Sequence, residues 1–563
     1  MLKNSITGQG VSRGLQFFFA FLCLFVYAGS LFFPLMDKDA AHHANIALYM
    51  YEHDNWINLV DRQKDYLDKP HFLFWSSLLS FKIFGVNTFA HRLPALIFAL
   101  ISIYSTYQLA KHLAGRRTAT LAAVILATAQ AFVLSINDAR METPLTAGII
   151  FGLWHLIVYI DRHRFLNIVL AALGAAIAFA TKGWIGPVVM FVPAFFYILF
   201  HNKWGVLASF KTWAFVPLFF LLISPVLYAY YIQFDLHPEK VIRGKSGRSG
   251  IHFILWDQLF ERSSGFDQGK KGRNSEYFFL YHTFLWAFFP WSLLAYAAVV
   301  AWFVKLKRNK KWQQPFSFAV AGFAFLLFSI SFSNFKMPHY VIMLLPLTAM
   351  FTAGFLVRII ESPSALKWIY PIQVTLGIIT LLLVSAINFY FFPVNAIAVF
   401  FILIFIYLLF LKKFNSRAIK VLTISAAMSL LLNFVLNYHF FPQLLKYQGG
   451  NQLVKEFEKL PVKPHRDSIV LMETNAHSFD YYMNHNHQIT SPGEAIAQYD
   501  RNKNYYYLMT NHQAAWIREQ GMGVDPLVKH IDHNVTTITL KFLNPKTRHR
   551  SMDTLMLARL VKP

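Results

Sequence analysis

Residues 143–164 read TPLTAGIIFGLWHLIVYIDRHR, and this stretch decides the fold. It is a long apolar run that ends at Arg162 and Arg164. A helix that crosses a bilayer needs about 20 mostly apolar residues, and cytoplasmic segments beside such helices carry an excess of Lys and Arg. The stretch therefore predicts a membrane-spanning helix whose C-terminal end faces the cytoplasm.

The same kind of segment recurs along the whole chain. Of the 563 residues, 56% are hydrophobic and 14% are charged, whereas soluble proteins carry about 25% charged residues. We predict a polytopic α-helical membrane protein with about 13 transmembrane helices. A shorter apolar stretch, 71–85, is typical of an interfacial or re-entrant helix. The predicted spans are 15–35, 92–113, 119–136, 143–160, 165–181, 184–201, 212–231, 276–303, 316–332, 338–358, 369–391, 394–411 and 418–438.

The basic residues orient the chain. With the N-terminus in the cytoplasm, most of them fall in the inner segments, and the short outer turns hold Arg140, Lys182 and Lys336. The net charge of +24 therefore reflects helix ends and contact with membrane lipids, and we expect no nucleic-acid partner. The inner basic residues are Lys3, Arg13, Lys111, Arg116, Arg117, Arg162, Arg164, Lys203, Lys211, Lys305, Lys307, Arg308, Lys310, Lys311, Arg358, Lys367, Lys412, Lys413, Arg417 and Lys420.

The first apolar run has two interpretations. Ala28-Gly29-Ser30 could mimic a signal-peptidase site, but Leu31-Phe32-Phe33 continues the run past it. We therefore expect an uncleaved anchor. The single cysteine, Cys23, lies in this run, so the chain can form neither an internal disulfide nor a Cys-based zinc site.

Three long segments then lie on the outer side: 36–91, 232–275 and 439–563. We predict a membrane domain over 1–438 and a small soluble α/β domain over 439–563. In the latter, Ser468–Thr474, Tyr505–Thr510, Thr536–Phe542 and Thr554–Leu560 resemble strands, and Gln452–Leu460 and His512–Glu519 resemble helices.

Two carboxylates open the first outer segment. Asp37 and Asp39 stand at the outer end of the first span, and a helix is predicted from Ala40 to Tyr51. A carboxylate in such a pocket can act as a general base, with its pKa set by burial and neighbouring cations. The alternative is that Asp39 caps the helix.

Other outer residues are candidates for binding a phosphate or holding the site. Asp68 and Lys69 lie in a turn before the 71–85 helix; Lys69 could bind a phosphate, or it could be a solvated surface lysine. Burying a charged side chain at the depth of the bilayer is energetically costly, so such residues are functional candidates by default. The alternative is that a long charged side chain extends to the membrane interface and has no function. The charged residues of the short outer turns are Asp138, Arg140, Glu142, Lys182, Lys336 and His339.

Short motifs in a fixed order connect the chain to a family. They are Asp39-Ala-Ala-His-His-Ala44, Asp68-Lys69-Pro70, His91-Arg92-Leu-Pro94, Glu142-Thr-Pro-Leu-Thr146, Thr181-Lys-Gly183, Phe289-Pro-Trp291 and Phe335-Lys-Met-Pro-His-Tyr340. Over residues 15–440 the chain resembles the C-type glycosyltransferases that use polyprenyl-phosphate sugars. The similarity is to the branch of the lipid A aminoarabinose transferases and protein O-mannosyltransferases.

The resemblance implies roles for individual residues. Asp39 matches the catalytic carboxylate, and Glu142 matches a second acidic position in the same cavity. Lys69 matches the residue that meets the lipid phosphate, Asp68 the acidic residue beside it, and Arg262 an arginine that also holds phosphate. Lys182 and Lys336 are further candidates for the donor phosphate, and Asp37, Asp138, Arg140 and His339 for support of the site.

The chain departs from the family pattern at two positions. Ala40 follows Asp39 where Asp-Glu is commoner, and Gln258 stands where some members carry a metal-binding histidine. The resemblance therefore implies no certain cofactor, and a divalent metal is possible.

The leading hypothesis is an inverting glycosyltransferase in the bacterial inner membrane. It would move a sugar from a polyprenyl (undecaprenyl) phosphate to a lipid A, glycan or protein acceptor at the periplasmic face. One alternative is a transporter or flippase for lipid-linked sugars, which would need charged or broken helices deep in the bilayer. Another is a non-enzymatic assembly factor whose C-terminal tail is a binding module.

Overall fold

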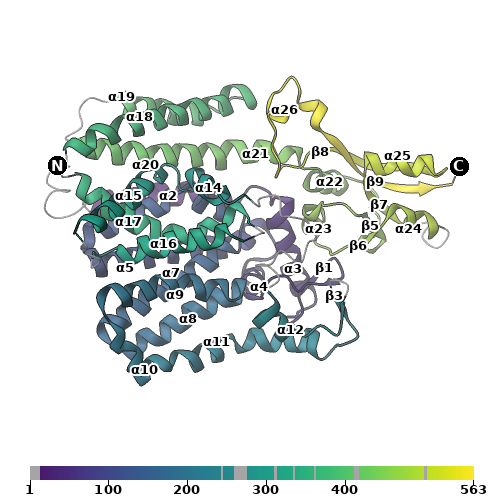
Figure 1. Cartoon of the computed structure of the whole chain (residues 1–563). Coiled ribbons are helices and arrows are strands. Elements are labelled where there is room, and N and C mark those ends of the chain that lie inside the picture. The colour runs from purple at the N-terminus through teal and green to yellow at the C-terminus, as the bar shows by residue number, and fades with distance from the viewer. Residues whose placement is uncertain are drawn as a thin grey trace.

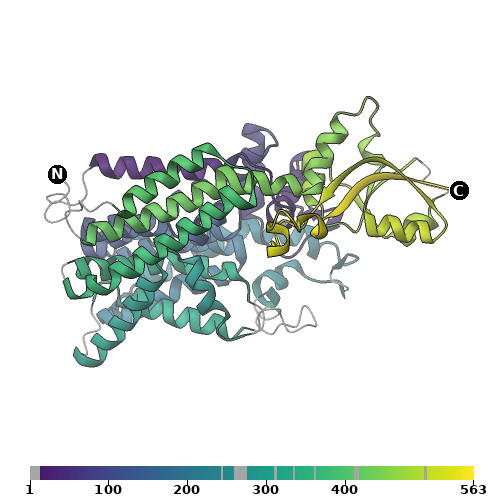
Figure 2. The same ribbon diagram turned by 90° about the horizontal axis from the view of Figure 1, so that it is seen from above.

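The computed structural model describes residues 13–242, 245–258, 276–309, 314–333, 336–360, 363–410, 417–499 and 504–562. Figure 1 and Figure 2 show a bundle of long helices with a five-stranded sheet at one end. The residues from 449 onward, which carry this sheet, are called the C-terminal part below.

Seven helical stretches of the described chain are long and apolar enough to cross a membrane. This confirms a polytopic helical membrane protein, while the number of thirteen spans stays a prediction. The seven stretches contain α5 (Thr88–Ala127), α7 (Glu142–Arg162), α8 (Phe165–Lys182), α11 (Phe215–Tyr230), α17 (Leu345–Ile360), α18 (Pro363–Ala386) and α20 (Arg417–Val435). The shorter apolar helices are α2 (Arg13–Ala28), α4 (Phe72–Phe84), α9 (Ile185–His201), α16 (Ser317–Ser331) and α19 (Ala396–Phe410).

One break in the helices falls at an expected span boundary, and another falls inside an expected span. The backbone of α5 leaves the helical region at Gly115 (φ 79°, ψ 174°), between the predicted spans 92–113 and 119–136. The prediction of one span over 276–303 is wrong, because α14 (Phe279–Ala287) and α15 (Ser292–Asn309) are separate helices. Pro290 lies between them; it has no N–H to donate, and its ring interrupts a helix.

The helices α7 and α8 pack against each other with almost no space between their backbones. A Cβ atom added to Gly174 would lie 2.5 Å from the Cα of Gly152 and 2.7 Å from the carbonyl oxygen of Gly148. Small residues let two membrane helices approach this closely. The contact fixes the two helices as one unit, with the N-terminus of α7 and the C-terminus of α8 at the same end.

In the C-terminal part, helices cover both faces of the five-stranded sheet. The strand order is β6 (Gln488–Thr490), β5 (Ile469–Met472), β7 (Tyr506–Thr510), β9 (Asp553–Val561) and β8 (Gly523–Asp532). Strand β5 is parallel to both of its neighbours, β6 and β7, whereas β9 is antiparallel to β7 and β8. The helices α22 (Gly449–Glu458) and α23 (His477–Met483) pack on one face, and α25 (Asn511–Glu519) packs on the other.

Most of the elements expected in this part exist, and the α/β composition is observed. The expected strand over Thr536–Phe542 is wrong: it lies in a loop that ends in α26 (Leu540–Leu543), which Thr539 caps. Strand β8 was not predicted, because it is an edge strand with Pro526 inside it and polar residues along it. The division into two domains at residue 439 stays a prediction.

Hydrogen bonds and ion pairs join the C-terminal part to the first outer segment. Arg62 Nε lies 2.7 Å from Asp480 Oδ2, and His487 Nδ1 lies 2.8 Å from Asp480 Oδ1, all fully or almost fully buried. Asn45 donates to the carbonyl oxygen of His477 (2.9 Å). The C-terminal part therefore sits directly over the segment that carries Asp39.

Candidate active site

Asp39 lies in a short π-helical turn, η2 (Asp37–Ala41), which leads into α3 (His42–Glu52). The predicted helix after Asp39 is therefore confirmed. The interpretation of Asp39 as a helix cap is wrong, because Ala41 occupies the cap position of α3 and no side chain caps that helix. The Asp39 carboxylate instead lies 3.1 Å from Arg140 Nη2, and 41% of its side chain is exposed.

Arg140 joins three acceptors. It lies in the turn between α6 (Gln130–Asn137) and α7, after Ala139 with its left-handed backbone (φ 44°). Besides Asp39, it contacts Asp138 (2.7 Å) and donates to His339 Nδ1 (3.0 Å). Since a guanidinium can only donate, His339 Nδ1 is the acceptor, and a neutral His339 carries its proton on Nε2.

Glu142 continues the network from His339. It is the first residue of α7; its carboxylate lies 3.5 Å from His339 Nε2 and 2.5 Å from the ammonium of Lys182, the last residue of α8. Only 4% of Glu142 and 8% of Lys182 are exposed. An acid at a helix N-terminus and a base at a helix C-terminus both match the helix dipoles. The close packing of α7 and α8 thus places this buried ion pair.

The six residues of the short outer turns were predicted separately, and five of them form one connected network with Asp39. The order of contacts is Asp39, Arg140, His339, Glu142 and Lys182, with Asp138 attached to Arg140. These residues are called the charge network below. They come from η2, the α6–α7 turn, α7, α8 and η7 (Pro338–Leu344).

The charge network keeps Asp39 ionised. Burial alone would raise the pKa of Asp39, but the Arg140 guanidinium, with smaller contributions from His43 and His339, lowers it below its ordinary value. Asp138 behaves in the opposite way. Burial raises the pKa of Asp138 to about 6, although Arg140 pulls it down, while the negative charge of Asp39 adds to the rise.

Lys69 lies close enough to His43 for its charge to act on that imidazole. Its ammonium is paired with Asp68, and 19% of its side chain is exposed. His43 is one helical turn after Asp39. Burial lowers the pKa of His43 to about 3; His42 and the positive charge of Lys69 contribute to the fall, and the negative charge of Asp39 opposes it. Asp39 and Lys69 therefore both act on the same buried imidazole.

Three predicted site residues are placed elsewhere or are not described. Asp37 points toward the C-terminal part, where it accepts a hydrogen bond from the backbone N–H of Ser478 (2.6 Å). Lys336 donates to the carbonyl oxygen of Ser331 (2.7 Å), and its ammonium lies 5.6 Å from the centre of the Tyr277 ring. Arg262 lies outside the described residues.

Sequence reasoning missed two residues at this site. His43 appears in the sequence analysis only as part of the Asp39–Ala44 motif, although its spacing of four residues from Asp39 places both on one helix face. Gln258 was considered only as a departure from the family; its side chain donates to the carbonyl oxygen of Asp68 (3.1 Å) and so positions the turn before Lys69. Within the described ranges, no group of three or more His, Cys, Asp or Glu side chains is arranged to hold a metal ion.

Comparisons with known proteins show what this chain is similar to. Residues 68–229 match the family of dolichyl-phosphate-mannose-protein mannosyltransferases. An uncharacterized protein of Aquifex aeolicus is 27% identical over 75% of this chain and 77% of its own length. The undecaprenyl phosphate-alpha-4-amino-4-deoxy-L-arabinose arabinosyl transferase 2 of Proteus mirabilis is 26% identical over 63% of this chain and 61% of its own. This chain thus spans about three fifths of that transferase.

The solved structure of ArnT from Cupriavidus metallidurans bound to undecaprenyl phosphate has a similar fold. It superposes with a TM-score of 0.72 over 97% of this chain and 98% of its own, at 15% sequence identity. The structure of the same protein in the apo state gives a TM-score of 0.71 at 16% identity. At this level of identity the likeness concerns the fold, which extends over the C-terminal part as well as the bundle.

Proposed function

We propose that this chain is a C-type glycosyltransferase that uses polyprenyl-phosphate sugars, in the branch of the aminoarabinose transferases. It moves a sugar from an undecaprenyl-type phosphate donor to a lipid A, glycan or protein acceptor. The reaction takes place at the outer face of a bacterial inner membrane, with the N-terminus in the cytoplasm and the C-terminal part in the periplasm. The observation that carries the proposal is the contact between the Asp39 carboxylate and Arg140, at a site where Asp39 and Lys69 both act on the buried His43.

The proposed step is a single displacement with inversion. Asp39 takes the proton of the acceptor hydroxyl while the acceptor oxygen forms a bond to the anomeric carbon. The bond from that carbon to the phosphate oxygen breaks, and the polyprenyl phosphate leaves with the electron pair. Lys69 and Arg262 stabilise the negative charge of the departing phosphate.

Within the charge network the roles are different. Lys182 is already paired with Glu142 at 2.5 Å, so we assign it to holding Glu142 rather than to the donor. Glu142 and His339 then fix the guanidinium of Arg140, which in turn orients Asp39. Lys336 remains a candidate for the donor phosphate. A divalent metal, if one is bound, would supply charge to the same phosphate; no step above depends on it.

The position of the charges favours an enzyme over a transporter. Glu142 and Lys182 stand at the ends of α7 and α8, so the charge network lies at the outer ends of the spans. A transporter places such groups in the middle of the membrane, at interrupted helices.

The decisive experiment is Asp39→Asn. Loss of a general base typically costs on the order of 10²–10⁴ in rate, so transfer of labelled sugar from undecaprenyl-phosphate sugars to cell-envelope acceptors should fall by that factor. The matched control is Asp54→Asn in the same outer segment, whose side chain is 78% exposed and paired with Lys82; it should transfer normally. Full activity of Asp39→Asn would show that Asp39 is not the general base.

A second experiment separates the enzyme from an assembly factor. Native mass spectrometry of the purified protein should detect bound undecaprenyl phosphate. The Lys69→Gln variant should carry less of this lipid. An assembly factor that performs no chemistry should instead tolerate alanine at Asp39, Lys69 and Glu142 together without loss of function.

A further inference from the structure

One motif of the sequence, His91-Arg92-Leu-Pro94, has no part in the proposed reaction step. Arg92 lies in the second turn of α5. This is the outer end of the helix, where the Asn87 side chain accepts a hydrogen bond from the Ala90 N–H (2.9 Å) and caps the helix. The Arg92 side chain is fully buried.

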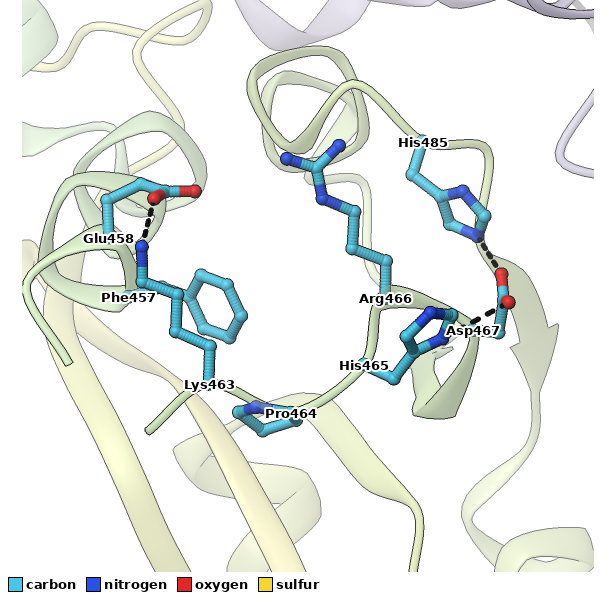
Figure 3. Close-up of a pocket in the computed structure, with 8 residues that line it drawn as sticks. All are labelled: Phe457, Glu458, Lys463, Pro464, His465, Arg466, Asp467 and His485. Carbon is cyan, nitrogen blue, oxygen red and sulfur yellow. Dashed lines mark hydrogen bonds and ion pairs between the residues drawn. The ribbon is translucent and has the colours of Figure 1, made fainter. Parts of the chain in front are cut away.

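A buried guanidinium needs a reason that a surface one does not. Figure 3 shows Arg466, an exposed arginine that lines a pocket of about 510 Å³ in the C-terminal part and can keep its charge in water. Burying a charged group is costly unless hydrogen bonds replace the water that it loses. The hydrogen bonds of Arg92 therefore indicate what the residue does.

Three of these hydrogen bonds go to main-chain carbonyl oxygens. Arg92 Nε donates to Asn137 (2.7 Å), Nη2 donates to Pro34 (3.0 Å) and Nη1 donates to Phe33. The guanidinium also lies over the Phe33 ring, 4.3 Å from its centre. Because a guanidinium is planar and holds its donors in a rigid fork, it fixes these carbonyl groups relative to one another.

The carbonyl groups belong to the two segments that carry the proposed base and its cationic partner. Phe33 and Pro34 lead into η2, which contains Asp39, and Asn137 ends α6 just before the turn that contains Arg140. The contact between Asp39 and Arg140 (3.1 Å) joins the same two segments through their side chains. Arg92 joins them through their backbones.

Further contacts hold each segment in place. The Asn137 side chain donates to Asn437 (2.7 Å), and the carbonyl oxygen of Leu35, the residue after Pro34, accepts from Gln448 (2.9 Å). A rigid side chain that bridges two segments held in this way determines the distance between them.

The charge of Arg92 acts on the same site. Burial raises the pKa of Asp138 to about 6, and the positive charges of Arg140 and, to a smaller extent, Arg92 oppose that rise. Removing the charge of Arg92 should therefore raise the pKa of Asp138 further. General damage to the fold would not produce such a shift.

We propose that Arg92 is a positioning residue for the transfer reaction. Its guanidinium holds the backbone before Asp39 and the backbone before Arg140 in one arrangement, which sets the place of the Asp39 carboxylate. Arg92 acts through these two residues and touches no substrate. This inference rests on the proposed function, because it concerns the base of that reaction.

The first experiment compares Arg92→Gln with the wild type in the transfer assay. Misplacing a reacting group by about 1 Å can cost about 10² in rate, so kcat should fall by about that factor. The KM for the undecaprenyl-phosphate sugar should not change, because the donor phosphate is assigned to Lys69 and Arg262. The matched control is Arg116→Gln, at an exposed arginine farther along α5, which should transfer normally.

A double-mutant cycle with Asp39→Asn separates positioning from damage to the fold. Residues that act as a unit are not additive, so Arg92→Gln should lower the residual rate of Asp39→Asn by at most about threefold. General damage to the fold would instead lower the rate by the same factor in both backgrounds.

Arg92→Lys separates the geometry of the guanidinium from its charge. Lysine keeps the positive charge but carries all of its donors on one atom, so it cannot bridge both segments as the fork does. We expect a low kcat and an acid limb of the pH profile of kcat/KM close to that of the wild type. Arg92→Gln should move that limb to higher pH. If Arg92→Gln does not fold, the cycle is run with Arg92→Lys, and the same non-additivity is expected.

Two results would overturn the proposal. One is a loss of kcat that is equal in the wild-type and Asp39→Asn backgrounds, and the other is a kcat of wild-type size in both Arg92 variants. In either case the transfer reaction and its base would stand without Arg92 as a positioning residue. Full activity of Asp39→Asn, or no transfer by the wild type, would instead overturn the proposed function itself.

Discussion

Asp37 and Asp39 stand two residues apart and contact different parts of the molecule. Asp39 is held by Arg140, whereas Asp37 accepts a hydrogen bond from Ser478 in the C-terminal part. Burial raises the pKa of Asp37 to about 7, the opposite of the direction for Asp39. Both acids could be recognised as candidates from sequence, but their separate roles could not. The difference depends on contacts with residues more than 100 positions away.

The titration of Asp138 predicts a pH dependence at the residue scale. Burial raises its pKa to about 6, so Asp138 loses its charge as the pH falls through that value. Of its two carboxylate contacts, Arg140 in the α6–α7 turn then keeps only the ionised Asp39. The tighter pair of Arg140 and Asp39 makes Asp39 a weaker base. We expect kcat/KM to fall below about pH 6, and Asp138→Asn to remove this acid limb while lowering the rate at neutral pH.

The stability effect of Asp138 has the opposite sign to its effect on rate. A carboxyl with a raised pKa in the folded state stabilises the fold fully below its unfolded value of 3.8, and this contribution is lost as the pH rises through about 6. Asp138→Asn should therefore gain stability relative to the wild type between pH 4 and pH 7. An acid limb in the rate profile of Asp138→Asn identical to that of the wild type would contradict the assignment.

At the scale of elements, the pairing of α7 with α8 determines the buried Glu142–Lys182 contact. Gly174→Ala should push these helices apart, because the new Cβ would meet backbone atoms of Gly152 and Gly148, which cannot rotate away. Overpacking of this kind costs about 1–3 kcal/mol, and the displaced ion pair should lower transfer as well. Thermal unfolding in detergent and the transfer assay measure the two effects.

The matched control for this prediction is Gly205→Ala. Gly205 has open space around its Cβ position, so this variant should retain the stability and activity of the wild type. Equal stability of Gly174→Ala and the wild type would show that α7 and α8 can separate without cost.

The helical segments could be predicted from sequence because apolar length is a local property. The breaks in them could not be predicted so well, because a break depends on what surrounds it. Pro290 interrupts the predicted span 276–303, whereas Pro225 and Pro371 lie inside α11 and α18 without ending either helix. A proline thus ends a helix at one position and lies within a helix at another, and the packing around each proline determines which of the two occurs.

At the scale of the whole molecule, the proposed orientation predicts the accessibility of two positions. Gly493 lies in α24 (Pro492–Ala497) of the C-terminal part, and Gly205 lies in η3 (Trp204–Ala208), just before α10 (Phe210–Trp213). Figure 1 shows α10 at the end of the bundle away from the sheet, and both glycines have open space around the Cβ position. In intact spheroplasts, Gly493→Cys should react with a membrane-impermeant maleimide, and Gly205→Cys should react only after lysis. The native Cys23 is buried and should contribute little background. The reverse pattern would invert the topology.

The buried Asp480 predicts how firmly the C-terminal part is held. Asp480→Asn leaves the guanidinium of Arg62 buried without its counter-charge, which typically costs about 3–5 kcal/mol. We expect faster hydrogen exchange in α23 and in the first outer segment. Glu456→Gln, which removes an exposed pair with Lys459, should leave exchange unchanged. Protection that is equal in the two variants would exclude Asp480 as the anchor.

The contact between the first outer segment and the C-terminal part had no counterpart in the sequence analysis. Arg62 and Asp480 are more than 400 residues apart, and neither belongs to a motif. Composition alone separates the apolar bundle from the polar C-terminal part, but the way the two surfaces meet depends on side chains that carry no local signal.

The turn η2 touches both the reacting groups and the C-terminal part. It is held closed by a hydrogen bond from the Ala41 N–H to the Met36 carbonyl oxygen (2.9 Å), so a displacement at Asp37 is passed to Asp39 through two peptide units. Ser478 in the C-terminal part donates to Asp37, so this turn links that part of the chain to the carboxylate that we propose as the base. A shift of the C-terminal part would therefore alter the setting of Asp39 without touching any residue of the charge network.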